Sequence, residues 1–366
     1  MPLTIALLPG DGIGPEVTAE AVRLLQTVAD YSGASFQFTT HLIGSAAIDA
    51  EGTSLPDRTR DACLAAGAVL LGAVGHPKHD GREPSARPEA GLLALRQALG
   101  GFANLRPAIC HAPLATRTAF QPDRVRGANL MIVRELLGGL YYGQPRGYTP
   151  DGQAAFNTLA YTKAEVERVA RVAFDLARKR QRRLASIDKA NVLETSRLWR
   201  GVVTDLAAEY ADVTVEHVHV DACAMRLATS PASFDVMVAD NLFGDILSDQ
   251  AASIAGSLGL LPSATVGGTV DLYEPVHGSA PDIAGKGWAN PIGAIASAAM
   301  LLRYSAGMER EAAEVERAIE DALAAGARTR DIAGPGEGAL STQEMGQAIH
   351  DALIEARERS HSYHAV

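Results

Sequence analysis

The sequence predicts an α/β fold in which short buried strands alternate with amphipathic helices. Apolar runs rich in β-branched residues recur along the chain, and segments with apolar side chains at helical spacing lie between them. The length of 366 residues corresponds to about two domains. A hydrophobic content of 47% and a charged content of 21% are typical of a globular chain and exclude a disordered one.

Two helix starts are marked by their chemistry. Pro15 suits the first turn of a helix after the first strand, because the N–H that it lacks would have no helical partner there. Thr162 and Glu165 form a capping-box pattern ahead of apolar residues at helical spacing, which predicts a helix. Strands are expected, in chain order, at residues 4–8, 68–73, 129–133, 184–187, 213–220 and 234–239.

Three segments lack a regular periodicity. Residues 138–152 are rich in glycine and proline, which predicts a loop or an extended arm. Residues 274–291 combine glycine, proline and small residues, and a long loop of this kind in a compact domain is usually functional. The polar tail from Arg357 is expected to fray.

Charge and cysteine content limit the partners and the compartment. The chain has 33 Lys and Arg against 43 Asp and Glu, and its net charge of −10 argues against a nucleic acid or an anionic membrane as partner. Three cysteines without a CxxC pattern fit a reducing cytosol, and the first residues lack the basic region of a signal peptide. A cytoplasmic protein is therefore expected.

Two loops are candidates for nucleotide binding. Residues 10–16 read GDGIGPE, but the spacing is GxGxG rather than GxGxxG, so a tight loop before a helix N-terminus is favoured over a Rossmann fingerprint. In the loop at residues 274–290, small residues would let the backbone approach a flat ligand. Asp282 could accept hydrogen bonds from ribose hydroxyls and would repel a 2′-phosphate, which favours NAD⁺ over NADP⁺.

Three aspartates form a candidate site for a divalent cation. Asp245 and Asp249 lie four residues apart after a predicted strand, so on a helix both carboxylates share one face. Asp221 ends another predicted strand and could reach the same place. Carboxylates without a nearby Cys or His pair suit Mg²⁺ or Mn²⁺ rather than zinc. A solvated acidic helix face is the alternative at this point.

Three arginines lie within or beside apolar runs, where each guanidinium needs an anionic partner. They either form internal salt bridges or bind a substrate with two carboxylates. Lys189 follows a strand and, if crowded by cations, could act as a base, although a surface lysine is the commoner case. Tyr141 could donate a proton or simply pack. The three arginines are Arg96, Arg106 and Arg134.

Long stretches in fixed order make the sequence similar to a known family. They include LLPGDGIGPEV, FANLRPA, RELLGGLYYG, DKANVLETSRLWR, NLFGDILSDQA and YEPVHGSAPDIAGKGWANP. The chain resembles the β-decarboxylating dehydrogenases, the isocitrate/isopropylmalate dehydrogenase family, over nearly its whole length. The resemblance implies NAD⁺-dependent oxidative decarboxylation of (2R,3S)-3-isopropylmalate to 4-methyl-2-oxopentanoate and CO₂, a reaction of leucine biosynthesis.

The resemblance also implies a role for each candidate residue. Lys189 is expected to remove the hydroxyl proton during hydride transfer, and Tyr141 to protonate the enolate after CO₂ leaves. Family members are homodimers in which Lys189 and Asp221 enter the partner's active site. The expected metal ligands are Asp221, Asp245 and Asp249, of which Asp221 also meets the substrate, and the expected carboxylate-binding residues are Arg96, Arg106 and Arg134.

The family fold implies two domains and is not a Rossmann fold. A large NAD-binding domain with a mixed sheet is expected from residues 1–102 and 256–366. Residues 103–255 are expected to form a smaller inserted α/β domain that carries metal ligands and a dimerisation arm. The expected NAD⁺ contacts are Glu274, His277, Gly278, Ser279, Ala280, Pro281, Asp282, Ile283 and Asn290.

Substrate specificity is expected to depend on residues 89–93, which begin with Glu89. Leu92 and Leu93 lie about one helical turn before Arg96 and could line an apolar pocket for an isopropyl group. The chain departs from the family pattern at two positions: Leu137 stands where Thr is common, and His76 where Gly is usual.

Other functions stay open at this stage. A paralogue would act on another 2-hydroxy diacid, such as 3-methylmalate, tartrate or homoisocitrate. A non-catalytic regulatory subunit would keep the fold, but it would be expected to lack at least one catalytic residue or metal ligand, and all are present. A metal-dependent enzyme without redox chemistry would have no use for the nucleotide loop.

Overall fold

The computed structural model describes residues 2–364, with side chains through residue 359. Its contacts divide the chain into two compact units. Unit 1 comprises Met1–Gly101, His111–Arg117 and Ala255–Val366, and unit 2 comprises Phe102–Cys110 and Thr118–Ile254. The functions expected of the two domains, coenzyme binding and dimerisation, stay predictions.

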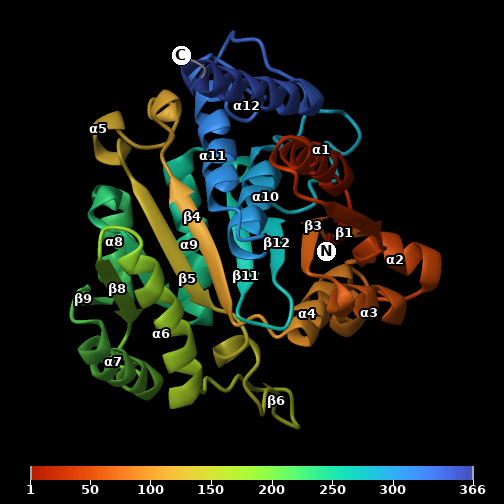
Figure 1. Ribbon diagram of the computed structural model, residues 1–366. Coiled ribbons are helices and arrows are strands. Elements are labelled where there is room, and N and C mark those ends of the chain that lie inside the picture. Colours follow the sequence, from red (N-terminus) through yellow and green to blue (C-terminus); the bar gives the residue numbers. More distant parts are fainter. Residues whose placement is uncertain (1, 365–366) are drawn as a thin grey trace. The chain divides into compact units, whose positions relative to one another are not determined.

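Unit 1 contains five strands in a mixed arrangement (Figure 1). They follow the order β2-β1-β3-β12-β11, in which all neighbours are parallel except β11 and β12. β3 is buried along its whole length, as a strand covered on both faces should be. The strands are β1 (Leu3–Gly10), β2 (Phe36–Thr40), β3 (Ala68–Ala73), β11 (Pro262–Val266) and β12 (Leu272–Pro275).

The helices of unit 1 pack on these strands. The most apolar of them, α10, contacts α1, α11 and β11, and ten of its residues are buried, which explains its nearly uncharged sequence. The helices are α1 (Gly14–Ser32), α2 (Gly44–Glu51), α3 (Asp57–Ala65), α4 (Pro88–Leu99), α10 (Ile292–Tyr304), α11 (Glu309–Ala324) and α12 (Thr342–His364). Short 3-10 turns lie at Pro77–His79, Pro84–Ala86, Ala112–Leu114 and Leu258–Leu260.

Five strands of unit 2 lie side by side in the order β4-β5-β10-β8-β9. All neighbours are parallel except β4 and β5, so both units confirm the predicted mixed α/β fold. The predicted capping box is present at the start of α6, where Thr162 and Glu165 each bond the other's backbone N–H. The strands are β4 (Ala103–Ile109), β5 (Asn129–Glu135), β8 (Arg183–Asp188), β9 (Thr214–His219) and β10 (Val236–Ala239).

The remaining segments of unit 2 include the predicted arm. After a 3-10 turn at Gly139–Tyr141, strands β6 (Gly147–Tyr148) and β7 (Ala155–Phe156) pair as a short antiparallel ribbon (Figure 1). Tyr148 and Phe156 expose large apolar side chains on it. The helices are α5 (Pro122–Val125), α6 (Lys163–Arg178), α7 (Glu194–Ala207), α8 (Val220–Thr229) and α9 (Asn241–Ala255), with 3-10 turns at Ala208–Tyr210 and Pro231–Ser233.

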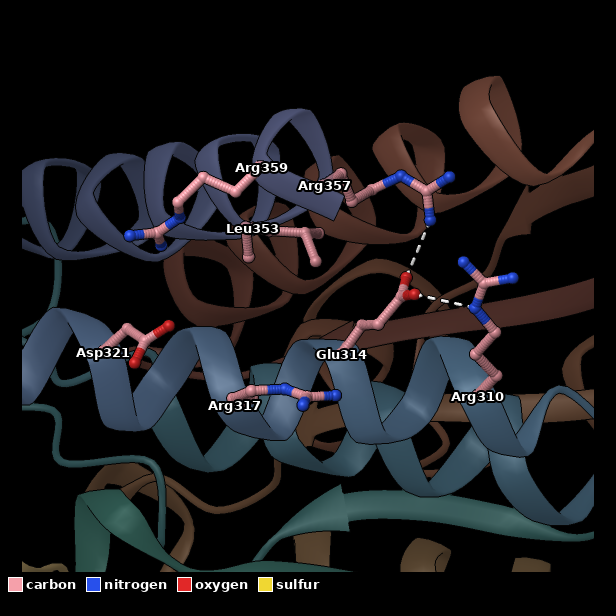
Figure 2. Close-up of a pocket in the computed structure, with 8 residues that line it drawn as sticks. Arg310, Glu314, Arg317, Asp321, Leu353, Arg357 and Arg359 are labelled. Atoms are coloured by element: carbon pink, nitrogen blue, oxygen red, sulfur yellow. Dashed lines mark hydrogen bonds and ion pairs between the residues drawn. The ribbon is translucent and has the colours of Figure 1, made fainter. Parts of the chain in front are cut away.

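The expectation of a fraying tail from Arg357 is wrong as far as His364, because α12 continues through this part, and residues 365–366 lie outside the described part of the chain. Arg357 donates to Glu314 of α11 over 2.8 Å, and its guanidinium lies 3.4 Å from the ring centroid of Tyr31. Arg310 donates to the same carboxylate (Figure 2). Through Arg357, these contacts hold the C-terminal part of α12 against Glu314 and Tyr31, which the polar composition of this part did not predict. They border a cavity of about 280 Å³ lined by Arg310, Glu314, Arg317, Asp321, Leu353, Ala356, Arg357 and Arg359.

No helix among the described residues is long and apolar enough to cross a membrane.

Candidate active site

Helix α9 presents a polar face to strands β4 and β5 of unit 2. Its start is set by Asp240, whose Oδ1 accepts the N–H of Phe243 over 2.7 Å. Asp245 and Asp249 lie on this helix, one turn apart, as predicted. Gly244 allows α9 to lie close to Arg134 of β5, because a Cβ at this position would lie 2.7 Å from Cγ of Arg134.

Arg106, on β4, meets both aspartates of this face. Its Nη1 lies 3.4 Å from Oδ1 of Asp249 and 3.7 Å from Oδ1 of Asp245, and it donates to Oγ of Ser248 over 2.8 Å. Its Nε donates to Oδ1 of the fully buried Asn104 over 2.7 Å. The guanidinium is therefore held from two sides in a partly buried position.

Arg134, on β5, is almost entirely buried and forms an ion pair through Nη1 with Oδ1 of Asp245. Its Nε and Nη2 donate to Oδ1 of Asn241 over 3.0 and 2.7 Å. Of the two predicted alternatives, the internal salt bridge is present at Arg134, and the binding of a substrate carboxylate stays a prediction. The guanidinium is paired with Asp245, and the pair lies beside the second aspartate and Arg106.

Tyr141 joins the same group from the 3-10 turn after β5. Its hydroxyl donates to Oδ2 of Asp245 over 2.8 Å, and the guanidinium of Arg134 lies 5.6 Å from its ring centroid. Burial, and then the hydrogen bond to Asp245, raise the pKa of Tyr141 above its ordinary value of 10.0. The phenol therefore keeps its proton at neutral pH. Five predicted residues come together in this way, and we refer to them as the Asp245 cluster: Arg106, Arg134, Tyr141, Asp245 and Asp249.

Lys189 and Asp221 form a second, separate arrangement in unit 2. Lys189 directly follows β8, and its Nζ lies 2.6 Å from Oδ1 of Asp221. The hydrogen bond from Lys189 holds the pKa of Asp221 below its ordinary value. Two expectations are wrong in detail: the neighbour of Lys189 is a carboxylate rather than a crowd of cations, and Asp221 lies in the first turn of α8, because β9 already ends at His219.

The donor atoms of the Asp245 cluster suit a hard divalent cation. Asp245 and Asp249 offer only carboxylate oxygens, and Mg²⁺ is commonly held by one or two carboxylates together with substrate oxygens and water. Across the described residues, however, no three His, Cys, Asp or Glu side chains converge closely enough to hold a metal ion. The third expected ligand, Asp221, lies in the separate pair with Lys189. The two aspartates therefore fit a divalent cation as two of its ligands.

Arg96 and the residues expected to set specificity lie in unit 1. Arg96, on α4, donates through Nη2 to Oε1 of Glu274 over 2.6 Å, and both side chains are largely buried. Leu92 packs partly against the hydrophobic core, whereas Leu93 is 47% exposed. Leu93 is therefore the more exposed of the two leucines, and a pocket lined by both stays a prediction. Glu89, the third residue expected to set specificity, lies close to Gly75. Its Oε1 is 2.8 Å from the position that a Cβ at Gly75 would take.

The glycine-rich first loop packs against the predicted coenzyme loop. The N–H of Ile13 donates to the carbonyl of Ser279 over 2.8 Å. A Cβ at Gly12, whose φ is +56°, would lie 1.9 Å from the same carbonyl oxygen, so only glycine fits there. Gly12 thus serves the contact between the two loops, whereas Gly10 and Gly14 lie against the backbone of Ala73 and Pro9, and Gly14 begins α1.

The predicted coenzyme residues differ in exposure and in pairing. Glu274 lies in β12 and not in the loop, because its backbone pairs with Ser263. Nδ1 of His277 donates to the carbonyl of Gly278 over 2.9 Å, while its buried Nε2 has no partner among the described residues. Such an orphaned atom suits a bound ligand and fits the expected coenzyme. The others are the exposed Gly278, Pro281 and Asp282, the half-buried Ala280 and Ile283, and the buried Ser279 and Asn290.

Sequence reasoning missed four residues that shape the Asp245 cluster. Asn104 is two residues before Arg106 in the same strand, so the period of two that places both side chains on one face could have found it. On α9, residues 241, 244, 245, 248 and 249 follow helical spacing, so a search of the face that carries Asp245 could have found three of them. The missed residues are Asn104, Asn241, Gly244 and Ser248.

This arrangement of arginines, tyrosine and paired aspartates on a mixed α/β fold defines the class of protein. The family model of the isocitrate/isopropylmalate dehydrogenases matches residues 4–349, so the chain belongs to this family. The 3-isopropylmalate dehydrogenase of Moorella thermoacetica is 54% identical over 353 residues, which cover 96% of this chain and 99% of that relative. That of Geobacillus kaustophilus is 52% identical over 354 residues, 96% and 95% of the two chains.

Solved structures agree with this assignment. The crystal structure of isocitrate dehydrogenase from Methylococcus capsulatus aligns with a TM-score of 0.84 and 38% identity, covering 96% of this chain and 99% of that chain. The apo β-decarboxylating dehydrogenase from Thermococcus kodakarensis aligns with a TM-score of 0.80 and 34% identity, covering 96% of each chain. The chain is therefore an enzyme of the isocitrate/isopropylmalate dehydrogenase family.

Proposed function

We propose that this enzyme catalyses the NAD⁺-dependent oxidative decarboxylation of (2R,3S)-3-isopropylmalate to 4-methyl-2-oxopentanoate and CO₂, a reaction of leucine biosynthesis. The observation that carries the proposal is the Asp245 cluster, which combines the buried Arg134, the partly buried Arg106, a protonated tyrosine and two aspartates. Relatives at 50–54% identity over nearly the whole chain are 3-isopropylmalate dehydrogenases.

The arginines are proposed to bind the substrate carboxylates. Arg106 and Arg134 are already held in place by Asn104 and Asn241, so little ordering remains when a substrate binds. Both lie beside Asp245, so a carboxylate that they grip is oriented next to the proposed metal ligands. Arg96 is assigned the same role, and its carboxylate partner in the free enzyme is Glu274.

Asp245 and Asp249 are proposed to hold Mg²⁺ or Mn²⁺, with Asp221 of a second copy as a further ligand. A bound cation would supply polarisation of the substrate's C2 oxygen, and bound NAD⁺ would supply the acceptor for the hydride from C2. Lys189 is proposed to accept the hydroxyl proton. Tyr141 keeps its proton at neutral pH and is proposed to give it to the enolate carbon after CO₂ has left.

The proposed enzyme is a homodimer with shared active sites. In the single chain, Lys189 pairs with Asp221, and this pair is separate from the carboxylates on α9. A second copy would supply the missing base and ligand. A cytoplasmic location is part of the proposal, and it is supported by three buried cysteines that form no disulfide.

Substrate choice is proposed to depend on the exposed Leu93, which offers apolar surface to an isopropyl group and no partner to an extra carboxylate. Leu137 replaces a hydroxyl residue beside the Asp245 cluster, and its N–H donates to Glu135. His76 opens a 3-10 turn by accepting the N–H of Lys78. These departures make the related diacids necessary competitors in any assay.

The test is NADH formation with 3-isopropylmalate, malate, tartrate, isocitrate, 3-methylmalate and homoisocitrate in parallel, each with and without EDTA. We expect the highest kcat/KM with 3-isopropylmalate, and loss of activity in EDTA that added Mg²⁺ or Mn²⁺ restores. A higher kcat/KM with another diacid would contradict the substrate assignment. Absence of turnover with every compound would favour a non-catalytic regulatory subunit.

A further inference from the structure

Asn241 occupies the start of α9 and is 1% exposed. Every hydrogen-bonding site of its side-chain amide is used. Oδ1 accepts two N–H groups of Arg134, and Nδ2 donates to the carbonyls of Leu136 and Gly138 over 3.1 and 3.0 Å. A buried amide satisfied in this way has a defined orientation, because a flip would leave four groups unpaired.

The acceptor side of this amide determines how Arg134 is oriented. A guanidinium is planar, so two donors gripped by one oxygen fix the plane of the whole group. The Nη1 that remains on the far edge then points at Asp245. Removal of Oδ1 of Asn241 would leave the ion pair of Arg134 with Asp245 but would take away two hydrogen bonds that orient the guanidinium.

The donor side holds the segment that carries Tyr141. The carbonyls of Leu136 and Gly138 flank the approach to the 3-10 turn Gly139–Tyr141. Tying both to α9 fixes the distance between this turn and the helix on which Asp245 lies. The tyrosine hydroxyl reaches the same carboxylate from the opposite oxygen.

We propose that Asn241 is a positioning residue that aligns the carboxylate-binding Arg134 and the proton donor Tyr141 with each other. The proposal rests on the function proposed above and assigns Asn241 no contact with substrate. One amide group links both residues, so a change in its acceptor should affect substrate binding, and a change in its donor should affect the proton-transfer step. The backbone N–H of Asn241 bonds the hydroxyl of Tyr161, which anchors the helix start in any side-chain variant.

Two variants distinguish the role of the Oδ1 acceptor of Asn241 from the role of its Nδ2 donor. Asn241→Asp keeps an oxygen for Arg134 but turns a second oxygen toward the two carbonyls, whereas Asn241→Ala removes both functions. For Asn241→Ala we expect the KM for 3-isopropylmalate to rise about 10-fold or more and kcat to fall about 10- to 100-fold. For Asn241→Asp we expect KM to return to within about 3-fold of the wild type while kcat stays low. The KM for NAD⁺ should not change in either.

A matched control is Asn129, which opens β5 and whose Oδ1 accepts from Arg180 over 2.9 Å. It is exposed and lies outside the Asp245 cluster. Asn129→Ala should leave kcat and both KM values unchanged. Thermal midpoints of all variants show how far each remains folded at the assay temperature.

The outcomes are distinct. Wild-type kcat and KM in a destabilised Asn241→Ala would show a purely structural role and overturn the proposal, as would an Asn241→Asp variant whose KM rises as far as that of the alanine variant. If the wild type prefers another 2-hydroxy diacid, the same comparison is made with that compound. If the wild type turns over none, the proposed function fails. In that case the affinity for 3-isopropylmalate is measured by calorimetry in the wild type, Asn241→Ala and Asn241→Asp, and it tests whether Asn241 orients Arg134. Absence of binding to the wild type overturns both proposals.

Discussion

At the residue scale, unit 2 holds two polar arrangements with different proton affinities. Burial and the Asp245 carboxylate raise the pKa of Tyr141, so this phenol holds its proton at neutral pH. The hydrogen bond from Lys189 lowers the pKa of Asp221, so this carboxylate stays charged. The protonated phenol of Tyr141 is the kind of group that the proposed proton donation to the enolate carbon needs.

Lys189→Ala is expected to lower kcat by about 100- to 10,000-fold, because the variant has no group to accept the hydroxyl proton. NAD⁺ binding and the dimer should persist, since neither depends on this side chain in the proposal. The measurements are steady-state kinetics, NADH titration and light scattering. Lys163→Ala, at the exposed start of α6, is the control. Retained kcat in Lys189→Ala would remove Lys189 from the mechanism.

At the element scale, α9 combines a structural and a chemical task. Its start contains the buried Asp240, which caps the N–H of Phe243, and burial raises the pKa of Asp240 to about 6. A buried acid with a raised pKa contributes stability that is present below its ordinary value of 3.8 and is lost as pH rises through about 6. The contribution of Asp240 to the stability of the start of α9 is therefore smallest at neutral and higher pH.

Asp240→Asn should stabilise the protein near pH 7 and have little effect near pH 3.5. Asparagine keeps an oxygen for the N–H of Phe243 but carries no charge, so the variant avoids a penalty on the order of 2–3 kcal/mol at neutral pH. The measurement is the thermal midpoint of both chains from pH 3.5 to 8. A difference that does not depend on pH would show that the carboxyl group does not titrate in the expected window.

At the scale of the whole molecule, the proposal requires two copies of the chain. The base and one metal ligand of each site come from the second copy, while Tyr141 and the α9 aspartates come from the first. A single chain then contains every catalytic residue but no complete site.

Mixing two inactive variants tests the sharing of sites. In a heterodimer of Lys189→Ala and Tyr141→Phe, one site combines the intact Tyr141 of one chain with the intact Lys189 of the other. After dissociation and random reassociation at equal amounts, half of the dimers carry one intact site, so activity should reach about a quarter of the wild type. Each variant mixed with itself is the control. No recovery, despite heterodimers seen by mass spectrometry, would place both residues in one chain's site.

Much of the fold could be predicted because its signals are local. The capping box of α6 involves residues three apart, and the shared face of Asp245 and Asp249 follows from their spacing. Strand β3 could be assigned from an uninterrupted apolar run. Each of these depends on neighbours within one or two turns.

Other features depend on residues far apart in the chain and could not be predicted. Asn241 is 107 residues from Arg134, and Arg96 is 178 residues from Glu274. The polar tail was expected to fray because its partners, Glu314 and Tyr31, lie on other helices. A sequence pattern shows that a charged side chain needs a partner, but not which one it finds.

The sequence by itself determined the alternation of strands and helices, the pairing of two aspartates on one helix face, and the family to which the chain belongs. These follow from periodicity and from long matches in fixed order. Only the tertiary structure decided that Arg106, Arg134 and Tyr141 meet at Asp245, that Lys189 pairs with Asp221, and that one buried asparagine holds two candidate site residues. The physical reason is that a buried charge or amide must be satisfied wherever the packed chain brings a partner, and packing joins residues that the sequence separates.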